Sequence, residues 1–403
     1  MGRKVVITSV GIVSSLGNTE SEIMDSLKEG KAGFTRSGFD DEILVCPVRD
    51  FNLKAFTGRL KNARYLNRGA GFSVAAAALA LKKEDRERGR FSQSGLFAGT
   101  GPNLDIGGEC FADRFGEIDS KRFQALWMLR FLPNTAASVI SELFGIHGEN
   151  ATITTACSAS LQALGEAFRK IKDGYLDMAL AGGGDSRLST GGILAYRKAQ
   201  ALHVGTEEPG KAYAPFDLKR SGFVPGEGGA FFLLEELSHA EKRNAQIYGE
   251  ICGFGCTMDG YTMTAPDPEG KEGEKAVRSA LDEADVPPEK INLVCSHGTG
   301  TLLNDEMEAN LIYRIFQGSR PPVISLKSWI GHLAAACGAV ETAITLFCMR
   351  GGLIPAIRNL EKPCHAGINL VAGSIEAEAD AAVVQSFGFG GQNSALVIRK
   401  WRH

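Results

Sequence analysis

The chain has 403 residues, 44% of them hydrophobic and 23% charged, with a formal net charge of -3 at pH 7. This balance argues against a nucleic-acid-binding protein, which would normally carry a basic excess. The longest apolar run, residues 74–81, is far shorter than the roughly 20 residues that cross a bilayer. We therefore predict a cytoplasmic protein without a membrane segment, in which the nine scattered cysteines are reduced.

Strand-like and helix-like segments alternate along the chain, which is typical of an α/β protein with helices packed on sheets. In chain order, strands are expected at residues 4–7, 95–98, 178–181 and 229–234, and helices at 65–82, 158–172 and 273–284. The length exceeds that at which one hydrophobic core keeps growing, so we expect two halves. A polar stretch at 239–244 separates an N-terminal half, 1–240, from a C-terminal half, 241–403.

A faint internal repeat is consistent with two related halves. Residues 152–157 lead through a polar turn into a small-residue helix, and residues 323–328 lead in the same way into the Ala-rich stretch 331–340. If a pseudo-twofold axis relates the halves, the two turns face each other across one pocket. Strand-turn-helix units recur in every α/β protein, so the repeat alone is weak evidence.

Cys157 is the first candidate for chemistry. It is surrounded by small residues, just after the β-branched run 151–155 and just before the helix-like stretch 161–168. A thiol at a helix N-terminus is close to unsatisfied backbone N–H groups, which favour the thiolate and make a better nucleophile. Most free cysteines are simply buried apolar residues, so the functional interpretation depends on the other motifs.

Three further motifs follow in the C-terminal part of the chain. The segment 296–301 reads Ser-His-Gly-Thr-Gly-Thr after an apolar strand, the segment 327–332 joins a lysine to a histidine, and the segment 386–393 contains Gly-Phe-Gly-Gly. Together with Cys157 they supply a nucleophile, two histidines and a flexible glycine turn. This combination of residue types suits covalent chemistry at a cysteine.

These motifs, in this order, resemble the β-ketoacyl synthase family over essentially the whole chain. The active-site pattern of that family is matched at Gly148, Ile153, Ala156, Cys157, Ser158, Ala159, Ser160 and Leu164. The resemblance implies a thiolase-like α/β fold with two similar βαβαβαββ halves in a five-layered αβαβα sandwich. It also implies decarboxylative condensation of a cysteine-bound acyl chain with a malonyl-carrier thioester, in fatty-acid or type II polyketide or polyene biosynthesis.

The resemblance also assigns roles to residues. Cys157 is the nucleophile, and His297 and His332, kept neutral, donate N–H bonds to the thioester oxygen of the malonyl group. The backbone N–H groups of Cys157 and Phe389 resemble the oxyanion hole of the family. Lys327 supports the histidines and pairs with Glu341, since a buried lysine without a carboxylate is costly. Substrate contacts are implied for Thr299, Thr301, Asp305 and Phe387.

The expected partner is an acyl carrier protein loaded with an acyl or malonyl group. A basic cluster could dock such an acidic protein by electrostatic attraction, although a solvated helix face is the more common meaning of such a cluster; it comprises Arg59, Lys61, Arg64 and Arg68. The family further implies a homodimer, or a heterodimer with a chain-length-factor-like subunit. No metal and no dissociable cofactor are expected.

The match is weakest where the acyl pocket is expected. This chain has Gly-Thr-Gly-Pro-Asn at 99–103, and the segment 105–130 is shorter than usual in the family. Three rivals stay open: a thiolase-type acyltransferase, an initiating synthase and a non-enzymatic chain-length-factor-like subunit. A thiolase would need a second catalytic cysteine near the C-terminus, an initiating synthase would pair the cysteine with His and Asn, and the non-enzymatic subunit would lack Cys157.

Overall fold

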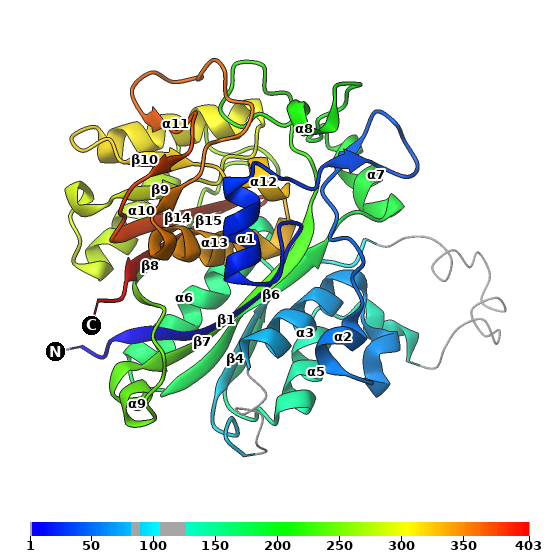
Figure 1. The fold of residues 1–403 in the computed structure, drawn as a ribbon, viewed down its shortest axis with the longest axis vertical. Coiled ribbons are helices and arrows are strands. Elements are labelled where there is room, and N and C mark those ends of the chain that lie inside the picture. The colour runs from blue at the N-terminus through cyan, green and yellow to red at the C-terminus, as the bar shows by residue number, and fades with distance from the viewer. Residues whose placement is uncertain (1, 82–88, 105–125, 403) are drawn as a thin grey trace.

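The computed structural model describes residues 2–81, 89–104 and 126–402, so most of the shortened segment 105–130 lies outside the described residues. Eleven strands form one continuous sheet, whose two parts, the N-terminal sheet and the C-terminal sheet, are joined where β1 pairs with β8 over three residues of each strand (Figure 1). The N-terminal sheet consists of β1 (Val5–Val13), β4 (Gly95–Gly99), β5 (Asn150–Ile153), β6 (Met178–Ser186) and β7 (Glu227–Glu236). The C-terminal sheet consists of β8 (Gly249–Met258), β9 (Leu293–Cys295), β10 (Pro322–Ile324), β12 (Asn369–Leu370), β14 (Ala381–Gly388) and β15 (Gln392–Lys400).

The two sheets repeat one topology. Outward from the junction, the N-terminal order is β1-β7-β6-β4-β5 and the C-terminal order is β8-β15-β14-β9-β10, with β12 added at the edge. In both, the first two pairings are antiparallel and the next two are parallel. This repetition is the duplication that the sequence repeat indicated. Short strand pairs outside the sheets are β2 (Thr35–Arg36) with β3 (Leu44–Val45), and β11 (Leu353–Ile354) with β13 (Ile375–Glu376).

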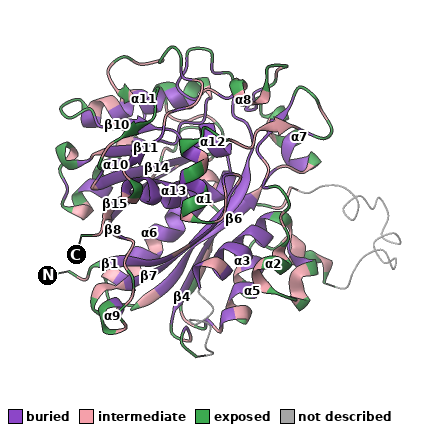
Figure 2. Cartoon of the chain, in the orientation of Figure 1, coloured by how far each residue is buried: buried purple, intermediate pink, exposed green. Residues whose placement is uncertain are grey.

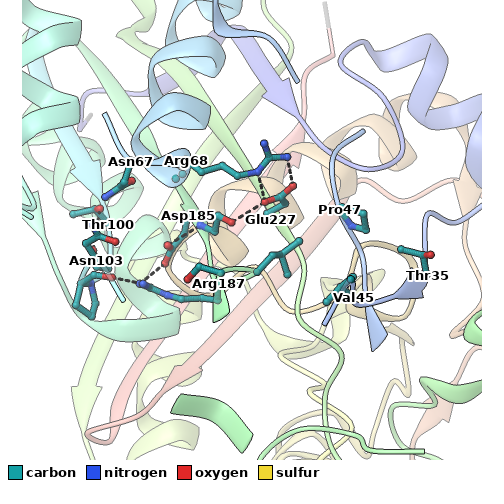
Figure 3. A pocket seen from close by; sticks show the side chains of 18 of the residues that line it. Thr35, Val45, Pro47, Asn67, Arg68, Thr100, Asn103, Asp185, Arg187 and Glu227 are labelled. Atoms are coloured by element: carbon teal, nitrogen blue, oxygen red, sulfur yellow. Dashed lines mark hydrogen bonds and ion pairs between the residues drawn. The ribbon is translucent and has the colours of Figure 1, made fainter. Parts of the chain in front are cut away.

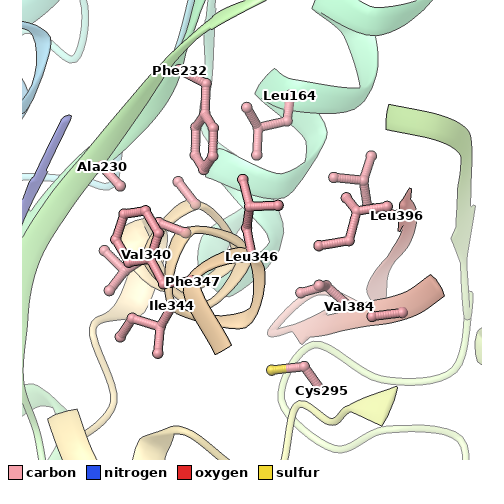
Figure 4. Close-up of a cluster of buried hydrophobic side chains, with 14 of the residues drawn as sticks. Leu164, Ala230, Phe232, Cys295, Val340, Ile344, Leu346, Phe347, Val384 and Leu396 are labelled. Carbon is pink, nitrogen blue, oxygen red and sulfur yellow. The ribbon is translucent and has the colours of Figure 1, made fainter. Parts of the chain in front are cut away.

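Two helices, α6 (Ala159–Lys172) and α13 (Cys337–Gly351), form the layer between the sheets. In α13 every residue from Cys337 to Met349 is buried, as expected for a helix covered on all sides (Figure 2). Gly338 lets the two helices approach closely, because a Cβ there would lie 2.4 Å from the Cβ of Leu161. The core at this layer draws on both halves (Figure 4): it includes Leu164, Ala230, Phe232, Cys295, Val340, Ile344, Leu346, Phe347, Val384 and Leu396.

Other helices cover the outer faces of the sheets. On the N-terminal side α3 (Arg68–Ala80) packs on β1, β6 and β7, and on the C-terminal side α10 (Lys271–Ala284) packs on β8 and β15. This completes the five layers α, β, α, β, α. Among the described residues, the remaining α-helices are α1 (Glu20–Lys28), α2 (Leu53–Thr57), α5 (Thr135–Phe144), α7 (Thr190–Lys198), α8 (Pro209–Ala212), α9 (Leu237–Lys242), α11 (Leu302–Phe316) and α12 (Lys327–Ile330).

Local sequence signals explain where several helices begin and end. Thr19 precedes α1 and forms a capping box with Glu22, and the side chain of Asn67 accepts the N–H of Ala70 at the start of α3. Gly145 ends α5 in the left-handed conformation that glycine adopts without strain. Within the described residues, no helix is both long and apolar enough to cross a membrane.

The internal repeat is present, but its register differs from the prediction. The turn that matches the nucleophile turn Ala156–Ser158 is Ala334–Ala336, directly before α13, and not residues 326–328. Both turns begin with an alanine at positive φ, 48° at Ala156 and 47° at Ala334. The offset arises because α12 and the loop after it are inserted between β10 and the second turn.

Candidate active site

The turn that carries Cys157 is held by two hydrogen bonds to Ser386 on β14. The hydroxyl of Ser158 donates to the carbonyl of Ser386 on β14 at 2.8 Å, and the hydroxyl of Ser386 donates to the carbonyl of Cys157 at 2.9 Å. Gly388 fits closely against this turn, because a Cβ there would lie 3.1 Å from the backbone nitrogen of Cys157, which is tighter than an ordinary contact. The small residues around Cys157 thus allow β14 of the C-terminal sheet to pack directly on the turn and hold it.

Cys157, His297 and His332 meet in one place, although 140 and 175 residues separate the histidines from the cysteine. The sulfur of Cys157 and one ring nitrogen of each histidine all lie within 4.8 Å of one another. The sulfur of Cys157 is 3.4 Å from Nε2 of His332, and the two imidazole rings are 5.7 Å apart between centroids in an edge-to-face arrangement. The convergence on which the sequence interpretation depended is therefore present in the structure.

The hydrogen bonds of His332 fix its tautomer. Its Nδ1 accepts the backbone N–H of Ala334 at 2.9 Å, so in the neutral ring the proton is on Nε2, which faces the sulfur of Cys157. Burial, together with the charge of Lys327, lowers the pKa of His332 to about 3. His332 therefore presents a neutral N–H donor to the reacting groups at any physiological pH.

His297 is held by its backbone. The carboxylate of Glu308 on α11 accepts the N–H of His297 at 2.6 Å and the N–H of Gly298 at 2.7 Å. Burial lowers the pKa of His297 well below its ordinary value, as do the charge of Lys327 and the neighbouring His332. Among the described residues, Nδ1 of His297 has no hydrogen-bond partner. This ring is thus also neutral.

Lys327 and Glu341 form an ion pair behind the histidines. Their Nζ and Oε1 atoms are 2.6 Å apart, and both side chains are fully buried. Burial raises the pKa of Glu341 to about 7, opposed by the charge of Lys327. Burial alone would lower the pKa of Lys327, but the charge and hydrogen bond of Glu341 raise it overall. The lysine therefore keeps its charge, which disfavours protonation of both histidines.

The thiol of Cys157 is not acidified in this geometry. Burial raises its pKa to about 11, against the opposing charge of Lys327 and a hydrogen bond from the backbone N–H of Phe389. The expectation that the helix N-terminus favours the thiolate is therefore outweighed by burial. A bound thioester must be attacked by a thiol that loses its proton during the reaction, with His332 and Phe389 as donors to the developing charge.

A cavity of about 350 Å³ surrounds these groups. Its walls include seven of the ten residues predicted for catalysis and substrate contact: Cys157, His297, Thr299, Thr301, His332, Phe387 and Phe389. Phe389 is 39% exposed at the β14–β15 turn, between Gly388 and the left-handed Gly390 and Gly391. The hydroxyls of Thr299 and Thr301 are 2.9 Å apart. Lys327 and Glu341 lie behind the wall and do not line the cavity.

Asp305 does not face the cavity. Its carboxylate is fully buried and accepts the backbone N–H groups of Phe216 at 2.7 Å and of Gly300 at 3.1 Å. The side chain of Arg220 lies 3.7 Å away. This placement favours a role in holding the Gly300 loop over direct contact with substrate.

The four predicted docking residues lie on the surface near the start of α3, and all four are exposed. Arg68 is engaged within the chain, because Glu227 accepts its Nε at 2.7 Å and its Nη2 at 2.5 Å. Arg68 lines a second cavity of about 450 Å³ (Figure 3). None of the four lines the catalytic cavity.

The donor types of Cys157, His297 and His332 also occur in zinc sites. Two observations oppose a metal ion at this position. Lys327 imposes a positive field that already lowers the pKa of both histidines, and such a field repels a cation. A structural zinc also needs a fourth ligand, and the described groups that cluster here supply three.

Sequence reasoning missed three residues that shape the site. Glu308 holds the His297 backbone, Phe223 packs on His332 with ring centroids 4.7 Å apart, and Asp185 accepts the backbone N–H of Ala335 at 3.1 Å. Glu308 had a signal, since it lies three residues after Asp305 on the same helix. The other two had none, because they reach the site only through the packing of distant elements.

A cysteine and two histidines at the junction of duplicated halves place the protein among the thiolase-fold acyltransferases. More narrowly, the chain belongs to the β-ketoacyl synthase family: the models of the N-terminal and C-terminal β-ketoacyl synthase domains match residues 2–240 and 248–361. This confirms the predicted family and fold.

Related sequences and solved structures agree with this family assignment. The chain is 34% identical to 3-oxoacyl-acyl-carrier-protein synthase 2 of Coxiella burnetii over 99% of both chains. A β-ketoacyl synthase structure from Burkholderia phymatum has a TM-score of 0.90 at 31% identity, covering 99% of this chain and 100% of the other. The ishigamide ketosynthase/chain length factor has a TM-score of 0.89 at 26% identity, covering 100% of both chains.

Proposed function

We propose that this protein condenses an acyl chain carried on Cys157 with malonyl-acyl carrier protein, giving β-ketoacyl-acyl carrier protein and carbon dioxide. The observation that carries the proposal is the convergence of Cys157, His297 and His332 in one cavity. The relative from Coxiella burnetii is named for the same carrier and product class. The pathway is fatty-acid or type II polyketide or polyene biosynthesis.

The first half-reaction loads the enzyme. The sulfur of Cys157 attacks the carbonyl carbon of the acyl thioester, and the negative charge develops on the carbonyl oxygen. The backbone N–H groups of Cys157 and Phe389 can stabilise this oxyanion. The bond to the carrier sulfur then breaks, and the carrier leaves as a thiol with the proton that Cys157 gives up. The acyl group is now held as a thioester on Cys157.

The second half-reaction uses the two histidines. Neutral His297 and His332 donate N–H bonds to the thioester oxygen of the malonyl group. They stabilise the enolate that forms when the bond to the carboxylate breaks and carbon dioxide leaves. The enolate carbon attacks the carbonyl of the acyl group on Cys157, and the bond to sulfur breaks. The sulfur leaves as a thiolate and takes up a proton from solvent, which restores the thiol of Cys157. Because burial and the charge of Lys327 keep both rings neutral, they act as donors and not as charged acids.

The assembly is also part of the proposal. The carrier docks through the basic cluster near α3, and the functional unit is a homodimer or a heterodimer with a chain-length-factor-like subunit, as in the ishigamide ketosynthase/chain length factor. We place the boundary between the halves at residues 240 and 241, in the connection between β7 and β8. The matched family models end and begin on either side of it.

The test is a complete turnover followed by mass spectrometry. Incubation with acyl-carrier and malonyl-carrier thioesters should give one carbon dioxide and one β-ketoacyl-carrier product lengthened by two carbons per turnover. Cys157→Ser should lose product formation by at least about a thousandfold, whereas the exposed Cys256→Ser should match the natural protein. Acylation of Cys157 without any condensation would instead favour a thiolase-type transfer, and absence of acylation would favour a purely binding subunit.

A further inference from the structure

A serine on the wall of the catalytic cavity is hydrogen-bonded to a buried histidine. Ser221 and His203 both lie in the long connection between α7 and β7 (Figure 1). Oγ of Ser221 is 2.7 Å from Nδ1 of His203. Ser221 is exposed and lines the cavity together with Cys157, whereas the side chain of His203 is only 6% exposed and lies behind the wall. The residue that bears the hydroxyl thus stands at the cavity, and the imidazole supports it from the interior.

Backbone hydrogen bonds fix the segment that carries this serine. The N–H of His203 donates to the carbonyl of Phe223 at 2.9 Å, which holds the two parts of the connection side by side. The N–H of Gly222 donates to the carbonyl of Gly300 at 3.0 Å. The ring of Phe223 packs on that of His332 with centroids 4.7 Å apart. The segment is therefore attached both to the Gly300 loop and to a catalytic histidine.

A carboxylate lies on the far side of the imidazole. Oε2 of Glu207 is 3.3 Å from Nε2 of His203. A hydrogen bond from its own backbone N–H lowers the pKa of Glu207, as do the nearby side chains of His203 and Arg36, so the group is ionised at neutral pH. Such a carboxylate favours the proton on Nε2, which leaves the lone pair of Nδ1 to accept the serine hydroxyl. Ser221, His203 and Glu207 therefore stand in the order of a nucleophile, a general base and an orienting acid.

We propose that Ser221 is a second nucleophile, which hydrolyses acyl thioesters that enter the catalytic cavity. The inference rests on the proposed function, because that function brings acyl thioesters into this cavity. Oγ of Ser221 attacks the thioester carbonyl carbon, and its proton passes to Nδ1 of His203. The bond to the thioester sulfur breaks, and the leaving sulfur takes this proton. Water then attacks the ester on Ser221 and gives a proton to the same nitrogen. The serine oxygen leaves with that proton, so that a carboxylic acid is released and the enzyme is restored.

The experiment removes Cys157 so that the second nucleophile is observed by itself. Butyryl pantetheine is incubated with Cys157→Ala, and the released thiol is titrated with a chromogenic disulfide. This variant should hydrolyse the thioester at least about tenfold faster than C157A/S221A, and C157A/H203Q should be as slow as C157A/S221A. Ser238 is likewise exposed, and its hydroxyl donates to Glu236 at 3.1 Å. The control C157A/S238A should therefore match C157A.

The outcomes separate this inference from the proposed function. Equal hydrolysis by C157A and C157A/S221A would overturn the second nucleophile and leave the condensing activity of the natural protein in place. Because Ser221 is exposed, its replacement keeps the test decisive even if C157A/H203Q does not fold.

A fluorophosphonate reports on the same hydroxyl without a thioester. Peptide mapping of C157A should show the label on Ser221, and folded C157A/H203Q should take up at least about tenfold less. Labelling that does not depend on His203 would overturn the general base. Hydrolysis that depends on Ser221 in C157A, together with no condensation by the natural protein, would support this inference and refute the proposed function.

Discussion

The two turns at the junction of the halves share a backbone conformation but have different roles. Ala156–Ser158 and Ala334–Ala336 each begin with an alanine at positive φ and lead directly into a central helix. The second residue of the first turn is Cys157, whose sulfur reaches the cavity, and the second residue of the other is Ala335, whose N–H binds Asp185. One geometry therefore holds a nucleophile in one half and supports a histidine in the other.

The comparison shows how a duplicated fold makes an asymmetric site. The N-terminal turn provides the reactive atom, while the C-terminal turn is buried and fixes the tautomer of His332 through the N–H of Ala334. Each turn depends on a contact from the opposite half: Ser386 holds the first and Asp185 the second. The chemistry therefore requires both halves in register.

Removing Lys327, in the C-terminal half, should lower the stability of the protein more than any other change considered below. Lys327→Met leaves Glu341 buried without a partner, and breaking such a pair lowers the free energy of unfolding by about 3–5 kcal/mol. Urea unfolding followed by circular dichroism measures the change. The double variant K327M/E341Q should recover most of the loss because no unpaired charge is left. If the free energy of unfolding of Lys327→Met lies within about 1 kcal/mol of that of the natural protein, the pair does not stabilise the fold.

Substitution of either histidine should impair decarboxylation without impairing the reactivity of Cys157 in the first turn. H297A and H332A each remove a donor to the enolate, which should slow carbon dioxide release from malonyl-carrier protein by about a hundredfold to a thousandfold. Alkylation of Cys157 by iodoacetamide should be largely retained in both, as peptide mapping will show. Unchanged decarboxylation in both variants would refute their assignment as donors.

The pH dependence of Cys157 tests whether burial or the helix N-terminus controls the thiol. With a pKa raised to about 11, the thiolate fraction rises as pH rises towards that value. The alkylation rate should increase about tenfold per pH unit between about pH 7 and pH 9. Cys337, at the start of the other central helix, is completely buried and should stay unlabelled. A plateau near neutral pH would show that the helix N-terminus dominates.

The shared positive φ of the two turns predicts the smallest effect. Alanine at positive φ is strained, so glycine at Ala156 or Ala334 relieves the folded state while adding freedom to the unfolded chain. The unfolding free energy should change by less than about 1 kcal/mol in either variant. The matched control Ala163→Gly, inside α6, should lose about 1 kcal/mol or more. Similar losses in all three would contradict a strained turn.

The sequence anticipated much of the fold because its signals are local. The expected helix at 158–172 is α6 at Ala159–Lys172, and the expected strands at 95–98 and 178–181 lie within β4 and β6. The strand expected at 4–7 extends to Val13, because β1 pairs with β7 along almost its whole length. The register of the internal repeat was wrong, since no local signal marks α12 as an insertion.

The site was less accessible to sequence reasoning. The motifs identified Cys157, His297 and His332, and the resemblance to a family said that they meet. The raised pKa of the thiol could not be predicted, because it depends on how completely the surrounding chain buries the sulfur. The position of Asp305 behind the Gly300 loop likewise follows from its contact with Phe216, 89 residues away.

The position of the reactive groups on opposite halves has a consequence during synthesis. Cys157 is synthesised 140 residues before His297 and 175 residues before His332, and β14, which carries Ser386, comes later still. The nucleophile turn can therefore gain its contact with Ser386 only after nearly the whole chain has been made.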